Sequence, residues 1–130
     1  MDEISDLEMV RVIGEFLELG HMDNIAALFR KEPQWYRLTG ELVQDERFMV
    51  RMGVAVLFEE LVTTHPEEVR QAIPSLLPLL TDPTPFIRGE ACTILGIINS
   101  PDALHHLAAL TDDPDPQIRE IVEDCLKGRT

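Results

Sequence analysis

The clearest hydrophobic pattern in this chain lies between Leu76 and Gly96, where two apolar runs flank a turn that contains prolines. Throughout the sequence, apolar residues recur every three or four positions, which is the spacing of one helix face. Side chains with capping chemistry precede several of these segments, including Ser5, Asp23, Asp45 and Thr84. The pattern predicts an all-α chain, with helices over residues 6–19, 24–31, 33–44, 46–63, 66–80, 85–98, 101–110 and 116–127.

One expected helix carries two internal prolines. Pro74 and Pro78 each lack a backbone N–H and clash with the preceding helical turn. We therefore expect the helix over residues 66–80 to kink or break near Ala72 to Ser75. The helix over residues 46–63 is apolar nearly all round, which indicates that neighbouring helices enclose it.

A short motif recurs along the chain. Asp82 is followed six residues later by Arg88, with apolar Ile87 just before the arginine. The same arrangement stands thirty-one residues downstream and thirty-seven residues upstream, at Asp113, Ile118 and Arg119 and at Asp45, Val50 and Arg51. Self-similar units of two helices at this period are typical of solenoids, whose units bury their apolar faces only against each other.

The unit resembles a HEAT repeat, a family with a proline in the first helix, an aspartate in the turn and an arginine early in the second helix. Pro74, Asp82 and Arg88 fill these places, whereas the flanking units have Arg37 and His105 at the proline position. The resemblance implies a right-handed α-α superhelix of about eight helices in four hairpins. We expect one domain over residues 1–130, with an N-terminal capping pair (1–32) and three repeats (33–64, 65–99 and 100–130).

The recurring Asp and Arg residues have a structural and a catalytic interpretation. An aspartate in the turn can accept backbone N–H groups at the start of the second helix. The arginine can bond this aspartate or carbonyl groups of the next unit, and in HEAT families such side chains form a ladder between repeats. We favour a structural ladder, made of Asp45, Arg51, Asp82, Arg88, Asp113 and Arg119, over a catalytic array.

Charge narrows the range of partners. The formal net charge is −13, which opposes binding to nucleic-acid phosphates and to anionic membranes. The acidic start MDEISDLE has no basic region followed by an apolar run, and no apolar stretch approaches a membrane span. We expect a cytoplasmic protein that binds neither nucleic acid nor membrane.

The sequence offers no motif for catalysis, a cofactor or a metal. Cys92 and Cys125 stand in no CxxC or Cys/His cluster, and we expect both to be buried structural thiols. His105 and His106 are adjacent, so on a helix they point in different directions and cannot chelate one ion. We therefore expect no enzyme activity, no cofactor and no metal site.

The remaining candidate site is a face of the second helices, which line the concave side of helical-hairpin arrays. The repeat register predicts a patch with an apolar centre and acidic surroundings, at Met52, Val56, Glu60, Glu90, Thr93, Ile97 and Asp124. The competing interpretation is that Met52 and Val56 belong to the core. An exposed patch of this kind suits another protein with a basic or amphipathic segment.

We therefore expect a protein–protein interaction module, an adaptor, scaffold or assembly factor, that is a monomer or a weak homo-oligomer. Two alternatives follow from resemblance. The short repeats are similar to those of phycobilisome lyase subunits, which implies a lyase-type or chaperone-like role. Some HEAT-like proteins process nucleic acid as DNA glycosylases, through a basic concave face that this acidic chain lacks.

Overall fold

The computed structural model describes residues 4–128, and every regular element in that range is helical. The outer ends of the expected first and last units, residues 1–3 and 129–130, lie outside the described residues. The α-helices are α1 (Asp6–Glu18), α2 (Met22–Lys31), α3 (Thr39–Leu42), α4 (Phe48–Thr64), α5 (Ile73–Leu76), α6 (Pro85–Ile98), α7 (Pro101–Ala108) and α8 (Pro116–Lys127). Three 3₁₀ segments join them, η1 (Pro33–Leu38), η2 (Glu68–Ala72) and η3 (Leu77–Thr81).

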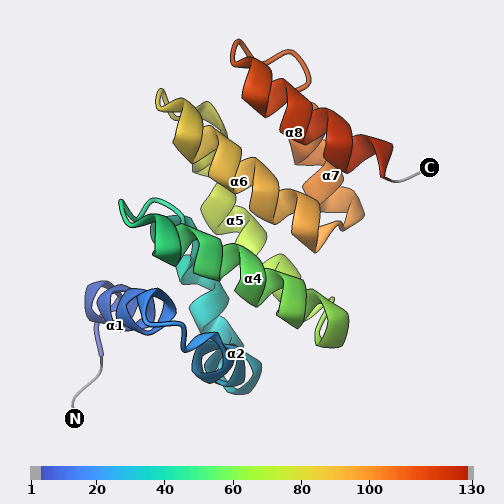
Figure 1. The fold of residues 1–130 in the computed structure, drawn as a ribbon. Helices are drawn as coiled ribbons and strands as arrows, with labels where there is room; N and C mark the ends of the chain where they lie inside the picture. The colour runs from blue at the N-terminus through green and yellow to red at the C-terminus, as the bar shows by residue number, and fades with distance from the viewer. Residues whose placement is uncertain (1–3, 129–130) are drawn as a thin grey trace.

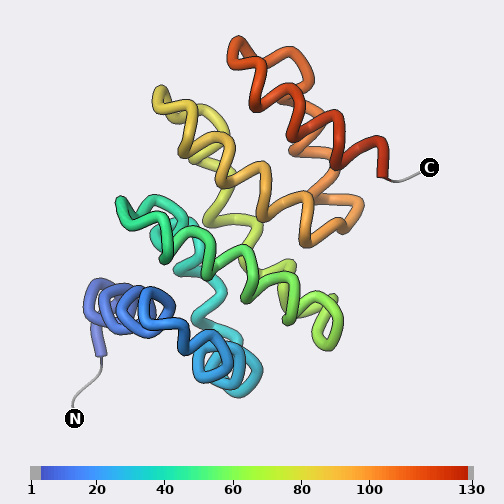
Figure 2. The backbone as a smooth tube through the Cα atoms, viewed as in Figure 1, coloured from blue at the N-terminus to red at the C-terminus, as the bar shows by residue number. Residues whose placement is uncertain are grey.

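The helices form two layers. Helices α4, α6 and α8 lie side by side and run in the same direction in one layer, while α5 and α7 lie behind them (Figure 1). The chain crosses back and forth between the layers as it advances (Figure 2). We call the outward side of α4, α6 and α8 the second-helix face. The all-α superhelical architecture expected from the sequence is confirmed.

The first helices of the two central units are not continuous α-helices. A single helix over residues 33–44 was a wrong prediction, because this segment is the 3₁₀ segment η1 followed by the short helix α3. At the switch, the Thr39 hydroxyl donates to the Tyr36 carbonyl (2.7 Å), and the Gly40 N–H donates to Ser75 Oγ (2.9 Å). The Gly40 N–H thus bonds to the neighbouring unit, and not to a carbonyl of its own segment as it would in a continuous α-helix.

The break expected near Ala72 to Ser75 is confirmed, since 3₁₀ segment η2 ends at Ala72 and α5 begins at Ile73. Pro74 lies at the start of α5 and Pro78 at the start of η3. A proline is tolerated in the first turn of a helix because its missing N–H has no intrahelical partner there. The two prolines therefore divide this segment into three short pieces.

Helices α1 and α2 are steeply inclined to the second helices, because both appear nearly end-on in Figure 1 while α4 lies across the view. Both pack on α4. The approach of α1 is close, since a Cβ at Gly53 would lie 3.1 Å from Leu17 Cβ. The expected Asp23 cap is wrong: α2 begins at Met22, with His21 as N-cap and no side-chain capping bond.

The core runs through all units, and three of its aromatic side chains lie in series. Phe29, Tyr36 and Phe58 are fully buried and stack edge to face, with ring centroids 4.9 Å and 5.9 Å apart along the series. Close helix contacts depend on two glycines, because a Cβ at Gly40 would overlap the Ser75 carbonyl oxygen and one at Gly96 would overlap Cys125 Sγ. Between residues 4 and 128, none of the helices combines the length and hydrophobicity of a membrane span.

Candidate functional site

Each second helix is preceded by an aspartate that closes the turn. The carboxylates of Asp45, Asp82 and Asp113 each accept the backbone N–H two positions later, at 2.8, 2.8 and 2.9 Å. The donors are the N-cap residues of α4, α6 and α8, which are Arg47, Thr84 and Asp115. Helix α4 therefore begins at Phe48 and not at residue 46, because Asp45 stands two positions before the N-cap, Arg47.

The three repeat arginines bond the same turn. Nη1 of Arg51, Arg88 and Arg119 donates to the carbonyl of the aspartate six residues earlier, at 2.7, 2.8 and 2.7 Å. The carbonyl partner thus belongs to the arginine's own unit and not to the next one. Each arginine fixes the start of its second helix against the preceding turn.

A bond between units occurs at Arg88. Its guanidinium donates through Nε and Nη2 to both carboxylate oxygens of Asp113, at 2.9 and 3.0 Å. The pair is well buried, and the Arg88 hydrogen bonds lower the pKa of the Asp113 carboxyl from its ordinary value of 3.8. Arg51 has a different partner in the next unit. Its Nε lies 3.5 Å from the Glu90 carboxylate, and it forms no bond to Asp82.

Large apolar side chains gather on the second-helix face. Of the nine that are exposed among the described residues, five lie on α4 and at the start of α6. We call these five residues the apolar strip: Phe48 (63% exposed), Met49 (48%), Met52 (41%), Val56 (42%) and Phe86 (45%). Surface apolar residues scattered singly need no explanation, whereas a contiguous set is typical of an interaction site.

Arg51 joins the two helices within the strip. Its guanidinium carbon lies 5.8 Å from the Phe48 ring centroid and 4.9 Å from that of Phe86. Cation–π attraction and the Glu90 ion pair hold this guanidinium between the two rings. The strip is therefore continuous from α4 to α6, with a fixed cation in its middle.

The predicted binding residues fall into different environments. Met52 and Val56 are exposed, as the register predicted, and so is Asp124 on α8. Thr93, Ile97 and Glu90 are half-buried, and Ile97 packs against the core. Glu60 is exposed, and Arg30 of α2 pairs with it at 3.2 Å, so part of its charge is already neutralised.

Three members of the strip were missed from the sequence. Phe48, Met49 and Phe86 lie in the first turns of their helices, where the sequence pattern indicates only helix caps and core positions. The repeat register contained a signal, because Met49 and Phe86 occupy equivalent positions, two residues before Arg51 and Arg88. Two apolar residues at one register position, both outside the core pattern, would have identified the face.

A groove lies between α6 and α8 beside the strip. Its volume is about 340 Å³, and its walls are formed by Pro85, Phe86, Gly89, Glu90, Asp115, Gln117, Ile118 and Ile121. Burial raises the pKa of the Glu90 carboxyl above its ordinary value, with Arg51 acting in the opposite direction. The groove combines an apolar floor with carboxylates at its edge.

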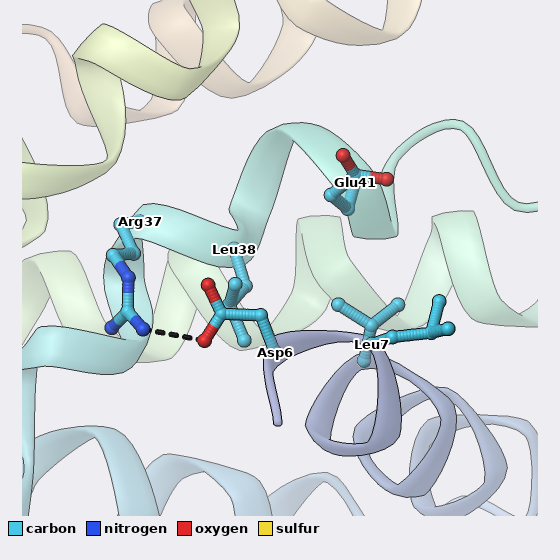
Figure 3. Close-up of a pocket in the computed structure, with 6 residues that line it drawn as sticks. Asp6, Leu7, Arg37, Leu38 and Glu41 are labelled. Carbon is cyan, nitrogen blue, oxygen red and sulfur yellow. Dashed lines mark hydrogen bonds and ion pairs between the residues drawn. The ribbon is translucent and has the colours of Figure 1, made fainter. Parts of the chain in front are cut away.

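A second pocket lies between the start of α1 and the η1–α3 segment. It has a volume of about 320 Å³ and is lined by Asp6, Leu7, Val10, Arg37, Leu38 and Glu41. Figure 3 shows Arg37 and Asp6 joined across it. Because this ion pair uses the only cation among the lining residues, the pocket has no free positive charge for a phosphate or a carboxylate ligand.

The two thiols differ in exposure. Cys92 is fully buried, and burial raises the pKa of its thiol to about 12. The expectation that both thiols are buried is wrong for Cys125, which is half-buried beside Gly96. At neutral pH the Cys92 thiol is therefore protonated and cannot act as a nucleophile.

The comparison with protein families gives one match. The family model for HEAT repeats matches residues 60–127, which is more than half of the 130 residues. No curated protein and no solved structure matches the chain. The expected similarity to phycobilisome lyases has no support from these comparisons.

Proposed function

The chain belongs to the HEAT repeat family, and from this premise we propose that it is a protein-binding module whose partner docks on the second-helix face. HEAT repeats generally mediate binding between proteins. The observation that carries the proposal is the apolar strip, because five large side chains remain in water on one face although the core is closed. Burying such side chains in an interface is favourable by roughly 25 cal/mol per Å² of apolar surface.

The candidate site comprises the strip and the residues predicted beside it, Glu60, Glu90, Thr93, Ile97 and Asp124. Apolar centres of this kind supply most of the binding energy of an interface, and charged rims set specificity and association rate. The rim here is acidic. We therefore propose a partner with an apolar anchor and basic flanks, for which this chain acts as an adaptor, scaffold or assembly factor.

We also propose that the protein has no catalytic role, in keeping with a family that is typically non-enzymatic. Two observations support this. Each repeat aspartate accepts a backbone N–H in its turn, each repeat arginine donates to a carbonyl of that turn, and Arg88 also pairs with Asp113. The Cys92 thiol is protonated and enclosed.

The test is affinity capture with matched variants. Val56→Asp places a charge in the middle of the strip, and its exposure predicts a folded variant with a melting temperature within a few degrees of wild type. Gln71→Asp adds the same charge on η2, in the first-helix layer, where Gln71 is exposed. A partner recovered with wild type and Gln71→Asp but lost with Val56→Asp supports the proposal.

Two results would count against it. If Val56→Asp unfolds the protein, Val56 belongs to the core and the face is misassigned. If Val56→Asp folds and retains every partner that wild type captures, the partner uses another surface.

A further inference from the structure

The groove between α6 and α8 exists because one position of the repeat holds glycine. Gly89 occupies the register position filled by Met52 in α4 and by Glu120 in α8, one residue after each repeat arginine. Its missing side chain opens the groove beside Phe86, which has a volume of about 340 Å³. This volume is at the small end of the range for ligand pockets, and therefore suits a single side chain better than a cofactor.

Packing does not require glycine at this position. A Cβ at Gly89 would lie 3.7 Å from Ile121 Cδ1 and 3.9 Å from Ile118 Cγ1, which is ordinary van der Waals contact. At Gly40 and Gly96, by contrast, a Cβ would overlap a neighbouring atom. Gly89 therefore differs from the glycines that permit close helix contacts, and its effect is to leave space.

The chemistry of the groove is that of a long cationic side chain. Ile118 and Ile121 supply an apolar floor, and the Phe86 ring is 45% exposed. At the edge stands Glu90, whose carboxylate is half-buried and has a single long ion pair, 3.5 Å from Arg51 Nε. The cost of removing this carboxylate from water is offset only by one long ion pair. A second cation that donates hydrogen bonds to it would therefore be bound favourably.

We infer that this groove receives an arginine side chain from a basic segment of the partner protein, with the guanidinium bonded to Glu90 and stacked on Phe86. This inference rests on the proposed protein-binding role of the second-helix face and specifies the partner's chemistry there. Arginine fits better than lysine because a planar guanidinium both stacks on aromatic rings and binds carboxylates in bidentate fashion. The molecule's charge of −13 favours such a segment at long range.

The arginine groove can be tested without knowing the partner. The probe is N-acetyl-arginine methylamide, titrated into the ¹⁵N-labelled full chain and followed by amide chemical shifts. We expect saturable shifts centred on Gly89, Glu90 and Ile121, with a dissociation constant on the order of millimolar for so small a ligand. The citrulline analogue has the same shape without the charge, and should bind at least about tenfold more weakly, the factor expected for a lost charge-assisted hydrogen bond.

Variants separate the groove from general acidity. Glu90→Gln removes the carboxylate and should also weaken the probe at least about tenfold, while Asp112→Asn removes a charge from an exposed turn and should leave binding within about twofold. Gly89→Met, which installs the side chain found at the equivalent position of α4, should fill the groove and abolish the shifts. Gly89→Ala, which meets only ordinary contacts, serves if the methionine variant does not fold.

Equal binding of the citrulline analogue, equal loss with Asp112→Asn and Glu90→Gln, or unchanged binding in the Gly89 variants would each overturn the arginine groove. These failures are distinguishable from failure of the proposed function. If Val56→Asp still releases a captured partner while the probe does not bind, only the groove assignment is wrong.

Discussion

At the scale of single residues, Asp113 combines two tasks that the other repeat aspartates do not. Like Asp82, it accepts the N–H of the residue that caps the next helix. It also receives two hydrogen bonds from Arg88 of the preceding unit in a buried site. Removing its carboxylate would leave a buried guanidinium without its partner, which is costlier than losing a turn bond alone.

The first prediction compares these two aspartates. Asp113→Ala should lower the free energy of unfolding by about 2 to 4 kcal/mol, through the lost turn bond and the unpaired Arg88. Asp82→Ala should cost about 1 kcal/mol, since it loses only the turn bond. Urea denaturation of both variants gives the comparison. Equal losses would mean that the pair between the units contributes nothing to stability.

The second prediction concerns acid. Hydrogen bonds from Arg88 and Arg47 lower the carboxyl pKa values of Asp113 and Asp45 below their ordinary 3.8. Near and below pH ~4 the unfolded state therefore binds more protons than the folded state, so stability falls as the pH drops through this range. Above about pH 5 both groups are ionised in both states, and their contribution is fully present and constant.

Urea midpoints between pH 7 and pH 3 test this second prediction. The midpoint should fall with pH, and the fall should be shallower in Asp113→Asn, which cannot titrate at this position. Glu90 has the opposite effect on the pH dependence of stability, because burial raises its pKa. This effect is present in both wild type and Asp113→Asn, so it does not alter the comparison. An identical pH dependence in the variant would show that Asp113 is not responsible.

The repeat motif predicted the residues of these turns, but not which of them bond between units. The six-residue spacing of Asp and Arg belongs to one local turn and the start of the helix after it, so the sequence alone shows it. Whether an arginine reaches the next unit depends on its neighbours in space. Arg51 is held between the rings of Phe48 and Phe86 and pairs with Glu90, so the expected ladder is interrupted beside Asp82.

At the scale of elements, the first helix of the unit over residues 33–64 departs most from prediction, whereas the break in the following first helix was predicted. The prolines at 74 and 78 announce a break from sequence alone. The apolar spacing within residues 33–44 does not announce the 3₁₀ segment η1, nor the bond that the Gly40 N–H makes to Ser75 of the neighbouring unit just after it. The spacing of apolar residues predicts which face of a segment is buried. It does not predict which acceptor each backbone N–H bonds to, and this choice distinguishes a 3₁₀ from an α-helix.

The third prediction uses two glycines as a matched pair. Gly40→Ala should lower the free energy of unfolding by at least about 2 kcal/mol, because the new methyl group overlaps the Ser75 carbonyl and the two units must move apart. Gly89→Ala adds the same methyl group at ordinary van der Waals distance from its neighbours, and should be neutral or slightly stabilising, since alanine favours helix over glycine. Thermal melts monitored by circular dichroism measure both. A neutral Gly40→Ala would contradict the close contact.

The first two helices have the features of a capping unit. Neither α1 nor α2 carries the repeat motif, both pack on α4, and Arg47 joins the start of α4 to Glu18 at 2.8 Å. We propose that this pair closes the solenoid at its N-terminal end. Terminal units of solenoids depart from the repeat pattern because one of their sides faces water.

At the scale of the whole molecule, the described surface combines a surplus of negative charge with one apolar strip. Eight of the ten Lys and Arg side chains in residues 4–128 form ion pairs. The unpaired carboxylates therefore leave a surplus of negative charge over the surface, and the second-helix face adds an apolar strip. Composition predicted the charge and the repeat predicted the architecture. The continuity of the strip across Arg51, between Phe48 and Phe86, depends on the three-dimensional meeting of α4 and α6.

The most direct measurement is site-specific photo-crosslinking in extracts of the cells from which the protein comes. A photoreactive phenylalanine derivative is placed singly at Met52 or Val56 on the second-helix face, and at Gln71 or Ala108 in the first-helix layer, all of them exposed. We predict one adduct of the same size from positions 52 and 56, and none from 71 or 108. Adducts that form at 71 or 108 in equal or greater yield, or that are absent from 52 and 56, would contradict binding through the second-helix face.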